Sequence, residues 1–171
     1  MTQDDAVELF YREHAADVLR WVIRLGGPYV HAEDLAQDVF ATAIRRYASF
    51  RGDASPRTWL FSITRNVVRN ARRRAALRRF VGLHDDMPES VSNELAVDEQ
   101  VVRLQRRRAV QRALETLSTK HREAIVLVDL EGLTAREAGE LLGVPEGTIS
   151  SRLHNGRKDF ADALVRQGIH K

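Results

Sequence analysis

Apolar residues recur every three or four positions between residues 10 and 25, and this spacing predicts an amphipathic helix. Gly26, Gly27 and Pro28 follow directly, and glycine and proline at that place indicate the end of the helix. The positions expected to face inward are Phe10, His14, Val18, Leu19, Val22 and Leu25.

The same spacing predicts a second helix from about His31 to Tyr47. Its opposite side is polar and available to a partner, because it carries Asp34, Gln37, Asp38 and Ala41. Its apolar side, expected to face inward, consists of Ala32, Leu35, Ala36, Val39, Phe40, Ala43, Ile44 and Tyr47.

Turn residues over 50–56 predict a loop, and Pro56 suits the first turn of a third helix. One side of this helix is basic, which suits a helix lying along a phosphate backbone, because cations on one face can all reach anions. The alternative is a basic face exposed only to solvent. The apolar side carries Trp59, Leu60, Ile63, Val67 and Ala71, and the basic side carries Ser62, Arg65, Arg69, Arg72 and Arg73.

The second half of the chain predicts a helix-turn-helix. Ser118 can cap a helix that ends before Gly132, with Ile125, Leu127 and Leu130 expected in the core.

Thr134 and Glu137 then form a capping box, in which each side chain binds the other residue's amide. This short helix buries Ala138, Leu141 and Leu142 and ends at Gly143. Pro145 opens another helix. Two helices joined by so tight a turn form a helix-turn-helix, in which the second helix is placed for the major groove of DNA.

Small and polar residues on the outer side of the last helix would allow close approach to base edges, and flanking cations suit phosphates. The inward residues are Ile149, Leu153, Gly156, Phe160 and Leu164. The outward residues are Gly147, Thr148, Ser151, His154, Asn155 and Lys158, with Ser150 and Arg157 on one flank and Arg152 on the other.

Charges are arranged in blocks along the chain. Residues 65–79 hold seven arginines and no acid, whereas residues 80–102 hold six acids and no Lys or Arg. The acidic block lacks helical periodicity and contains Gly82 and Pro88, so residues 81–97 are predicted to be a flexible acidic linker. The expected fold class is therefore all-α, with two small helical domains at residues 1–80 and 98–171.

Composition narrows the class of protein further. The chain has no cysteine, which excludes a disulfide framework, a thiolate zinc site and a cysteine nucleophile. It has no apolar run of about 18 residues, and its N-terminus is acidic, so a cytoplasmic protein without membrane insertion is expected. Arginine heavily outnumbers lysine, and arginine is favoured where phosphate or carboxylate is bound in a bidentate way.

Two stretches of sequence resemble a known family. The run HAEDLAQDVF at 31–40, followed by FRGDASPRTWLFSITRN at 50–66, resembles region 2 of extracytoplasmic-function (ECF) sigma factors. The run LSTKHREAIVLVDLEGLTAREAGELLGVPEGTISSRL at 117–153 resembles their region 4. The resemblance implies a transcription initiation factor without enzymatic activity, whose partners are core RNA polymerase, promoter DNA and an anti-sigma factor.

The resemblance also implies site residues. Core RNA polymerase would bind Asp34, Gln37 and Asp38. The minus-ten element, with an unstacked base, would bind Arg51, Gly52, Asp53, Ser55, Arg65, Asn66, Arg69 and Arg73. The minus-thirty-five element would bind Glu146, Gly147, Thr148, Ser150, Ser151, Arg152, His154, Asn155, Arg157 and Lys158.

Three residues depart from the family pattern. Ser150 stands where many members have Lys or Arg, Asn155 where Arg is frequent, and Gly156 where Ala is usual. The loss of two cations should weaken phosphate contacts, and a glycine inside a helix costs about 1 kcal/mol relative to alanine. The preference for the minus-thirty-five sequence is therefore where this chain is expected to differ.

Three alternatives remain open at the level of sequence. An ordinary helix-turn-helix repressor would bind duplex DNA without polymerase. An enzyme could use His31, Asp34 and Asp38, or His84, Asp85 and Asp86, as metal ligands. We nevertheless expect no cofactor and no metal site. Trp59 could stack on an extruded base, although its place on the apolar side favours the core. A free monomer is expected.

Overall fold

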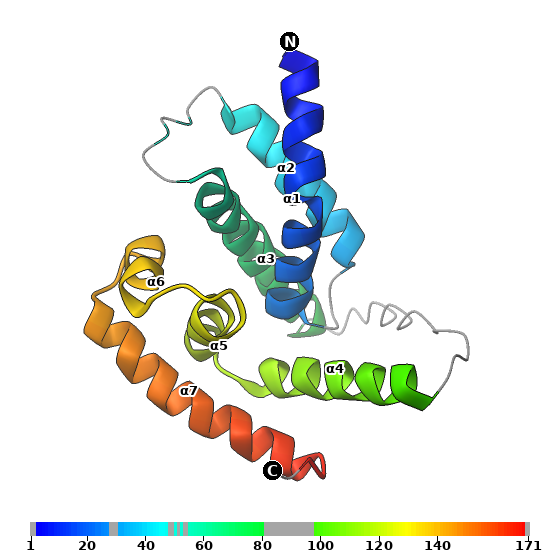
Figure 1. Cartoon of the computed structure of the whole chain (residues 1–171), viewed down its shortest axis with the longest axis vertical. Coiled ribbons are helices and arrows are strands. Elements are labelled where there is room, and N and C mark those ends of the chain that lie inside the picture. Colours follow the sequence, from blue (N-terminus) through cyan, green and yellow to red (C-terminus); the bar gives the residue numbers. More distant parts are fainter. Residues whose placement is uncertain are drawn as a thin grey trace. The chain divides into compact units, whose positions relative to one another are not determined.

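The computed structural model describes residues 3–27, 31–47, 50, 52, 55–80 and 98–169, and all its regular elements in this part of the chain are helices (Figure 1). The chain divides into two compact units, residues 1–88 and residues 89–171. The all-α prediction is confirmed. The predicted linker at 81–97 lies outside the described residues.

Unit 1 is a bundle of three helices, α1 (Gln3–Gly26), α2 (Ala32–Arg46) and α3 (Pro56–Phe80), each of which packs on the other two. Pro56 begins α3 as predicted, and the hydroxyl of Ser55 caps the helix by accepting a hydrogen bond from the amide of Thr58 at 3.1 Å. The bundle core contains Val18, Trp21, Val22, Leu25, Leu35, Val39, Phe40, Ala43, Leu60, Phe61, Ile63, Thr64 and Val68.

The buried side of α3 differs from the prediction. Phe61, Thr64 and Val68 are buried, whereas Val67 and Ala71 are only half-buried. Because α3 packs against both α1 and α2, it buries a wider stripe of its surface than helical periodicity predicted. Thr64 is tolerated in the core because its hydroxyl donates to the carbonyl of Leu60 at 2.9 Å.

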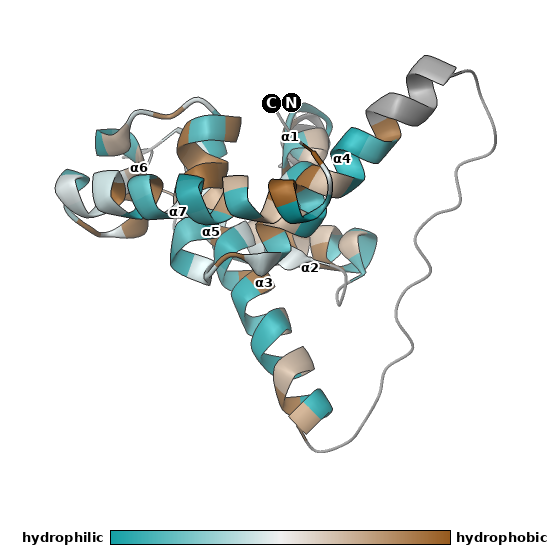
Figure 2. Cartoon of the chain, turned by 90° about the horizontal axis from the view of Figure 1, so that it is seen from below, coloured by the Kyte–Doolittle hydropathy of each residue, from teal (hydrophilic) through white to brown (hydrophobic). Residues whose placement is uncertain are grey.

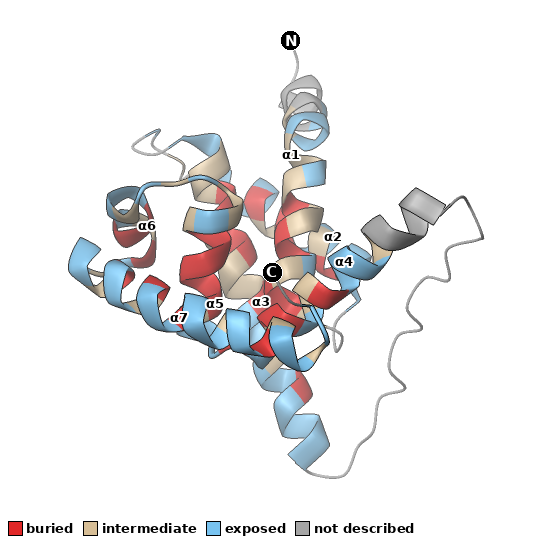
Figure 3. Cartoon of the chain, turned by 60° about the horizontal axis from the view of Figure 1, so that its bottom comes forward, coloured by how far each residue is buried: buried red, intermediate tan, exposed pale blue. Residues whose placement is uncertain are grey.

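Unit 2 contains α4 (Asp98–Thr116), α5 (Thr119–Ile125), the π-helical turn η2 (Val126–Leu130), α6 (Ala135–Leu142) and α7 (Glu146–Arg166). Helix α7 packs against α4, α5 and α6. Figure 3 shows that α5 is mostly buried, while α7 presents a long exposed side. The helix capped by Ser118 ends before Gly132 as predicted, but its last part is π-helical: the amide of Glu131 donates to the carbonyl of Val126, five residues back, at 3.0 Å.

Both predicted ends of α6, the first helix of the helix-turn-helix, are confirmed. Thr134 accepts from the amide of Glu137 at 3.2 Å, and the carboxylate of Glu137 accepts from the amide of Thr134 at 2.8 Å. The hydrogen bonds from the backbone amide and the hydroxyl of Thr134 lower the pKa of Glu137. Gly143 ends α6 at φ +67°, a conformation that L side chains rarely adopt.

Two glycines bring the helices of unit 2 into close contact. A Cβ on Gly139 would lie 2.7 Å from the carbonyl oxygen of Val144, in the turn before α7. A Cβ on Gly156 would lie 3.1 Å from Cβ of His121 and 3.2 Å from Cδ1 of Ile125. Gly156, which the sequence indicates only as a weak helix former, therefore has a packing reason: it lets α7 approach α5.

A buried arginine joins α4 to α5. Arg122 is 2% exposed and donates to the carbonyls of Leu114, Glu115 and Leu117, at 2.6, 2.9 and 3.0 Å. These carbonyls lie at the C-terminal end of α4 and just beyond it, where backbone acceptors lack helical partners and a cation is favoured. Neither α4 nor the role of Arg122 was predicted, because α4 has few apolar residues and its capping group comes from the next helix.

Candidate nucleic-acid interface

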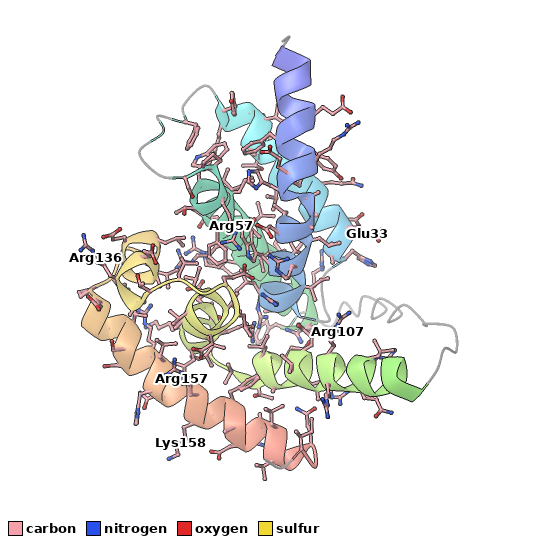
Figure 4. The ribbon with its side chains drawn as sticks, in the orientation of Figure 1. Glu33, Arg57, Arg107, Arg136, Arg157 and Lys158 are labelled. Atoms are coloured by element: carbon pink, nitrogen blue, oxygen red, sulfur yellow. The ribbon has the colours of Figure 1, made fainter. Side chains whose placement is uncertain are left out.

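The polar side of α2 is exposed as predicted. Asp34, Gln37, Asp38 and Ala41 are all exposed, and Leu35, Val39, Phe40 and Ala43 on the other side are buried. Glu33, labelled in Figure 4, and Asp34 stand in the first turn, where carboxylates also complement the helix dipole. This surface, called here the acidic face (Glu33, Asp34, Gln37 and Asp38), suits a positively charged protein partner.

Two residues that were predicted to face inward, one in the last turn of α2 and one just after it, are instead accessible. Ile44 is 53% exposed and Tyr47 is 43% exposed. Together with Glu8, Phe10, Tyr11, Phe40 and Ala43 they line an apolar pocket of about 330 Å³ between α1 and α2. The prediction was wrong because the C-terminal end of α2 lies at the rim of the bundle, where Tyr47 meets Phe10 of α1 beside an open pocket.

The loop before α3 is only partly described. Gly52 and Ser55 are exposed, and Arg51 and Asp53 lie outside the described residues. Ser55 already serves as the cap of α3. Trp59 is half-buried and its ring centroid lies 4.9 Å from that of Phe50 and 6.3 Å from that of Phe10. Trp59 is thus part of an aromatic cluster at the edge of the core, as its place on the apolar side of the helix favoured.

The beginning of α3 is fixed to α1 by a charged cluster. Nε of Arg57 lies 2.7 Å from Asp17, which also pairs with Arg20, and the Arg57 guanidinium stands 5.2 Å over the ring of Trp21. Burial raises the pKa of Asp17, but the hydrogen bonds and charges of Arg57 and Arg20 outweigh burial and hold that pKa below its ordinary value. The cluster therefore orients the turn that carries Ser55.

The basic side of α3 is smaller than predicted. Arg72 donates to the carbonyls of Leu25 and Gly26, at 3.1 and 3.2 Å, and so caps the C-terminal end of α1. Its prediction as one of four outward cations is therefore wrong. The helical wheel could not identify this role, because the carbonyls belong to a helix more than 40 residues away.

Exposed cations nevertheless remain on α3. Arg69 and Arg73 are exposed, and Arg65 and Asn66 are half-buried. The amide oxygen of Asn66 accepts from Arg69 at 3.0 Å and restricts the position of that guanidinium. The last turns of α3 mix hydrophilic and hydrophobic residues in Figure 2, and Leu77 and Phe80 are exposed there. We call Arg65, Asn66, Arg69 and Arg73 the α3 basic side.

The outer side of α7 matches the prediction closely. Gly147, Ser150, Ser151, His154, Asn155 and Lys158 are exposed, as is Glu146, while Thr148 and Arg152 are half-buried. Lys158 projects away from the helix (Figure 4). On the opposite side, Ile149, Leu153, Gly156 and Ala163 are buried, and the predicted Phe160 and Leu164 are half-buried.

Arg157, predicted on a flank of the DNA-facing side, is exposed and also makes a contact within unit 2 that periodicity did not indicate. Its guanidinium forms a two-pronged ion pair with Asp129 of η2, at 2.6 and 3.0 Å. A bidentate pair of this kind fixes orientation as well as charge. Arg157 thereby holds α7 against η2, and a phosphate would have to compete with Asp129 for it.

The alternative reading as a metalloenzyme finds no support in the described residues. They contain no group of three or more His, Asp or Glu side chains placed to hold a metal ion, so His31, Asp34 and Asp38 do not form such a group. His84, Asp85 and Asp86 lie outside the described residues. Within the same residues no helix is long and apolar enough to cross a membrane.

The fold therefore defines a helical, two-unit protein with a helix-turn-helix of the DNA-binding kind in its second unit. Comparison with known proteins agrees: residues 10–78 match the Sigma-70 region 2 family and residues 107–160 match the Sigma-70, region 4 family. The chain is 34% identical to the ECF RNA polymerase sigma factor SigL of Mycobacterium tuberculosis, over 93% of this chain and 89% of SigL.

Two further comparisons point the same way. The chain is 36% identical to the ECF RNA polymerase sigma factor SigE of Mycolicibacterium smegmatis over 91% of its own length, and spans 60% of SigE. The sigma factor RpoE of Bartonella quintana, solved in complex with the anti-sigma factor NepR, superposes with a TM-score of 0.71 at 25% identity, covering 95% of this chain and 98% of RpoE. The chain belongs to the ECF sigma factors, which are transcription initiation factors rather than enzymes.

Proposed function

We propose that this sigma factor uses three surfaces: the acidic face of α2 for core RNA polymerase, the α3 basic side and the loop before it for the minus-ten element, and the outer side of α7 for the minus-thirty-five element. The observation that carries this proposal is the exposed outer side of α7, because it is long, polar and positioned by a well-capped helix-turn-helix. An anti-sigma factor, like the one bound to the relative RpoE, would then act by covering some of these surfaces.

Transcription reconstituted from purified core RNA polymerase and this chain tests the proposal as a whole. A library of promoters with randomised minus-thirty-five and minus-ten elements should yield transcripts whose start sites depend on this chain. A repressor would instead bind duplex DNA well by itself and give no transcripts. Absence of transcripts from every promoter, with core that is active with another sigma factor, would exclude the proposed function.

Asp38→Arg should weaken binding to core RNA polymerase at least tenfold. The substitution reverses a charge on the exposed acidic face, and a like charge placed against a complementary partner is unfavourable, whereas no buried residue is touched. Affinity can be measured by fluorescence anisotropy of the labelled chain. Glu13→Arg, which reverses an exposed charge on α1, is the matched control and should bind core normally. Equal affinity of the Asp38 variant and the control would remove Asp38 from the interface.

Arg69→Ala combined with Arg73→Ala should reduce promoter opening and its dependence on salt. Both side chains are exposed, and each cation that contacts a phosphate adds roughly 0.7 to 0.9 to the slope of log affinity against log salt concentration. The double variant should thus lower the slope by about 1.5. Opening is followed by permanganate reactivity of unpaired thymines at several salt concentrations. Arg12→Ala, which removes an exposed arginine of α1, serves as control. If the double variant, this control and the unaltered chain open the promoter alike, the α3 basic side is only a solvated surface.

A further inference from the structure

Asn155 lies in the middle of the proposed reading helix and is exposed. It stands eight residues after Gly147, which at about 1.5 Å per residue is roughly 12 Å along the helix. The major groove is about 12 Å wide, so residues from Gly147 to Asn155 span the part of α7 that a groove can enclose. Lys158 follows one turn later and is exposed, which suits a phosphate at the edge of the groove.

The neighbours of Asn155 leave room for a base. A Cβ on Gly147 would meet nothing within 4 Å, so the start of the helix can approach DNA closely. Ser151, one turn before Asn155, is short and exposed. A longer side chain at either place would hold the helix farther from the base edges and out of reach of the Asn155 amide.

Among the exposed uncharged residues of α7 between Gly147 and Asn155, only Asn155 carries an amide. Its amide presents one acceptor and a donor side by side, which matches N6–H and N7 of adenine. A serine hydroxyl donates or accepts equally well and so distinguishes bases poorly. The long cation that could read guanine at the next exposed position, Arg157, is bound to Asp129 at 2.6 and 3.0 Å.

We infer that Asn155 selects adenine at one position of the minus-thirty-five element. The inference rests on the proposed role of α7 in binding that element. An arginine there would match O6 and N7 of guanine instead, so a single side chain decides between two purines.

The test is transcription by the full chain with core RNA polymerase over a promoter library randomised in the minus-thirty-five element, with the base preference read at each position. The unaltered chain should prefer adenine at one position by roughly tenfold or more. Asn155→Ala should abolish the preference at that position alone, and Asn155→Arg should change it from adenine to guanine. Asp162→Ala is the control, since Asp162 is exposed on α7 about 10 Å farther along the helix than Asn155, and it should leave every position unchanged.

Three outcomes would overturn the inference. Preferences that stay the same in both Asn155 variants mean that Asn155 reads no base. A uniform loss over all sequences in Asn155→Ala, together with a smaller salt slope, means that the residue only supports phosphate contact. No transcription by the unaltered chain from any library member means that the proposed function itself has failed, which the other two outcomes do not imply.

Discussion

Arg122→Ala is expected to lower the free energy of unfolding of unit 2 by about 3 kcal/mol or more. The variant removes a buried guanidinium and leaves the carbonyls of Leu114, Glu115 and Leu117 without this donor. A buried polar group that loses its partner costs about 1 to 3 kcal/mol, and hydrogen bonds to charged groups are the stronger ones. Because α4 contacts α7, loss of this junction should also loosen the support of the reading helix.

Urea denaturation of the full chain, followed by circular dichroism, measures this effect. The free energy of unfolding of Arg122→Lys should fall between those of Arg122→Ala and the unaltered chain, because a single ammonium keeps the charge but lacks the extended fork of donors with which the guanidinium reaches three carbonyls. Arg136→Ala is the matched control: Arg136 forms an exposed ion pair with Glu140, with the arginine side chain 78% exposed, and such pairs contribute less than about 1 kcal/mol. If Arg122 and Arg136 variants lose equal stability, the buried arginine is not a fixed part of the fold.

Gly139→Ala should displace the turn between α6 and α7 and so weaken recognition of the minus-thirty-five element. The new Cβ would lie 2.7 Å from the carbonyl oxygen of Val144, and a backbone atom cannot move aside as the end of a flexible side chain can. Overpacking costs about 1 to 3 kcal/mol, which exceeds the gain of about 1 kcal/mol that alanine brings to a helix. We expect a net loss of stability and a shift of α7 relative to α6.

Thermal unfolding and transcription from promoters with and without a minus-thirty-five element together test this expectation. Gly147→Ala is the control for stability, because its Cβ has open space and should raise the free energy of unfolding by up to about 1 kcal/mol. Transcription from a promoter that depends on the minus-thirty-five element should fall in Gly139→Ala more than transcription from one that lacks it. An increase in melting temperature for Gly139→Ala would show that the turn can adjust to a side chain.

The sequence predicted features that depend on neighbours along the chain. The capping box of Thr134 and Glu137, the cap at Ser118 and the end of α6 at Gly143 all have the expected geometry. Each joins residues within four positions of one another, so local physical chemistry is enough to specify them. The exposed sides of α2 and α7 also follow from helical periodicity, because a helix in a small domain buries only one stripe.

Roles that depend on distant residues could not be read from periodicity. Arg72 and Arg157 stand on wheels as outward cations, yet one caps α1 and the other pairs with Asp129. The wheel gives the direction of a side chain from its own helix and says nothing of what another helix places there. Arg122 was missed for the same reason.

By itself the sequence determined that the chain is helical, where α2, α3, α6 and α7 begin, and which sides of α2 and α7 face outward, because all these depend on spacing and capping within a few residues. Only the tertiary structure decided which arginines remain available to a partner and why glycine occupies position 156. Those properties arise where α7 meets α5 and η2, and where α3 meets the end of α1. Hydrogen bonds and close packing between helices are set by three-dimensional distance, which sequence separation does not encode.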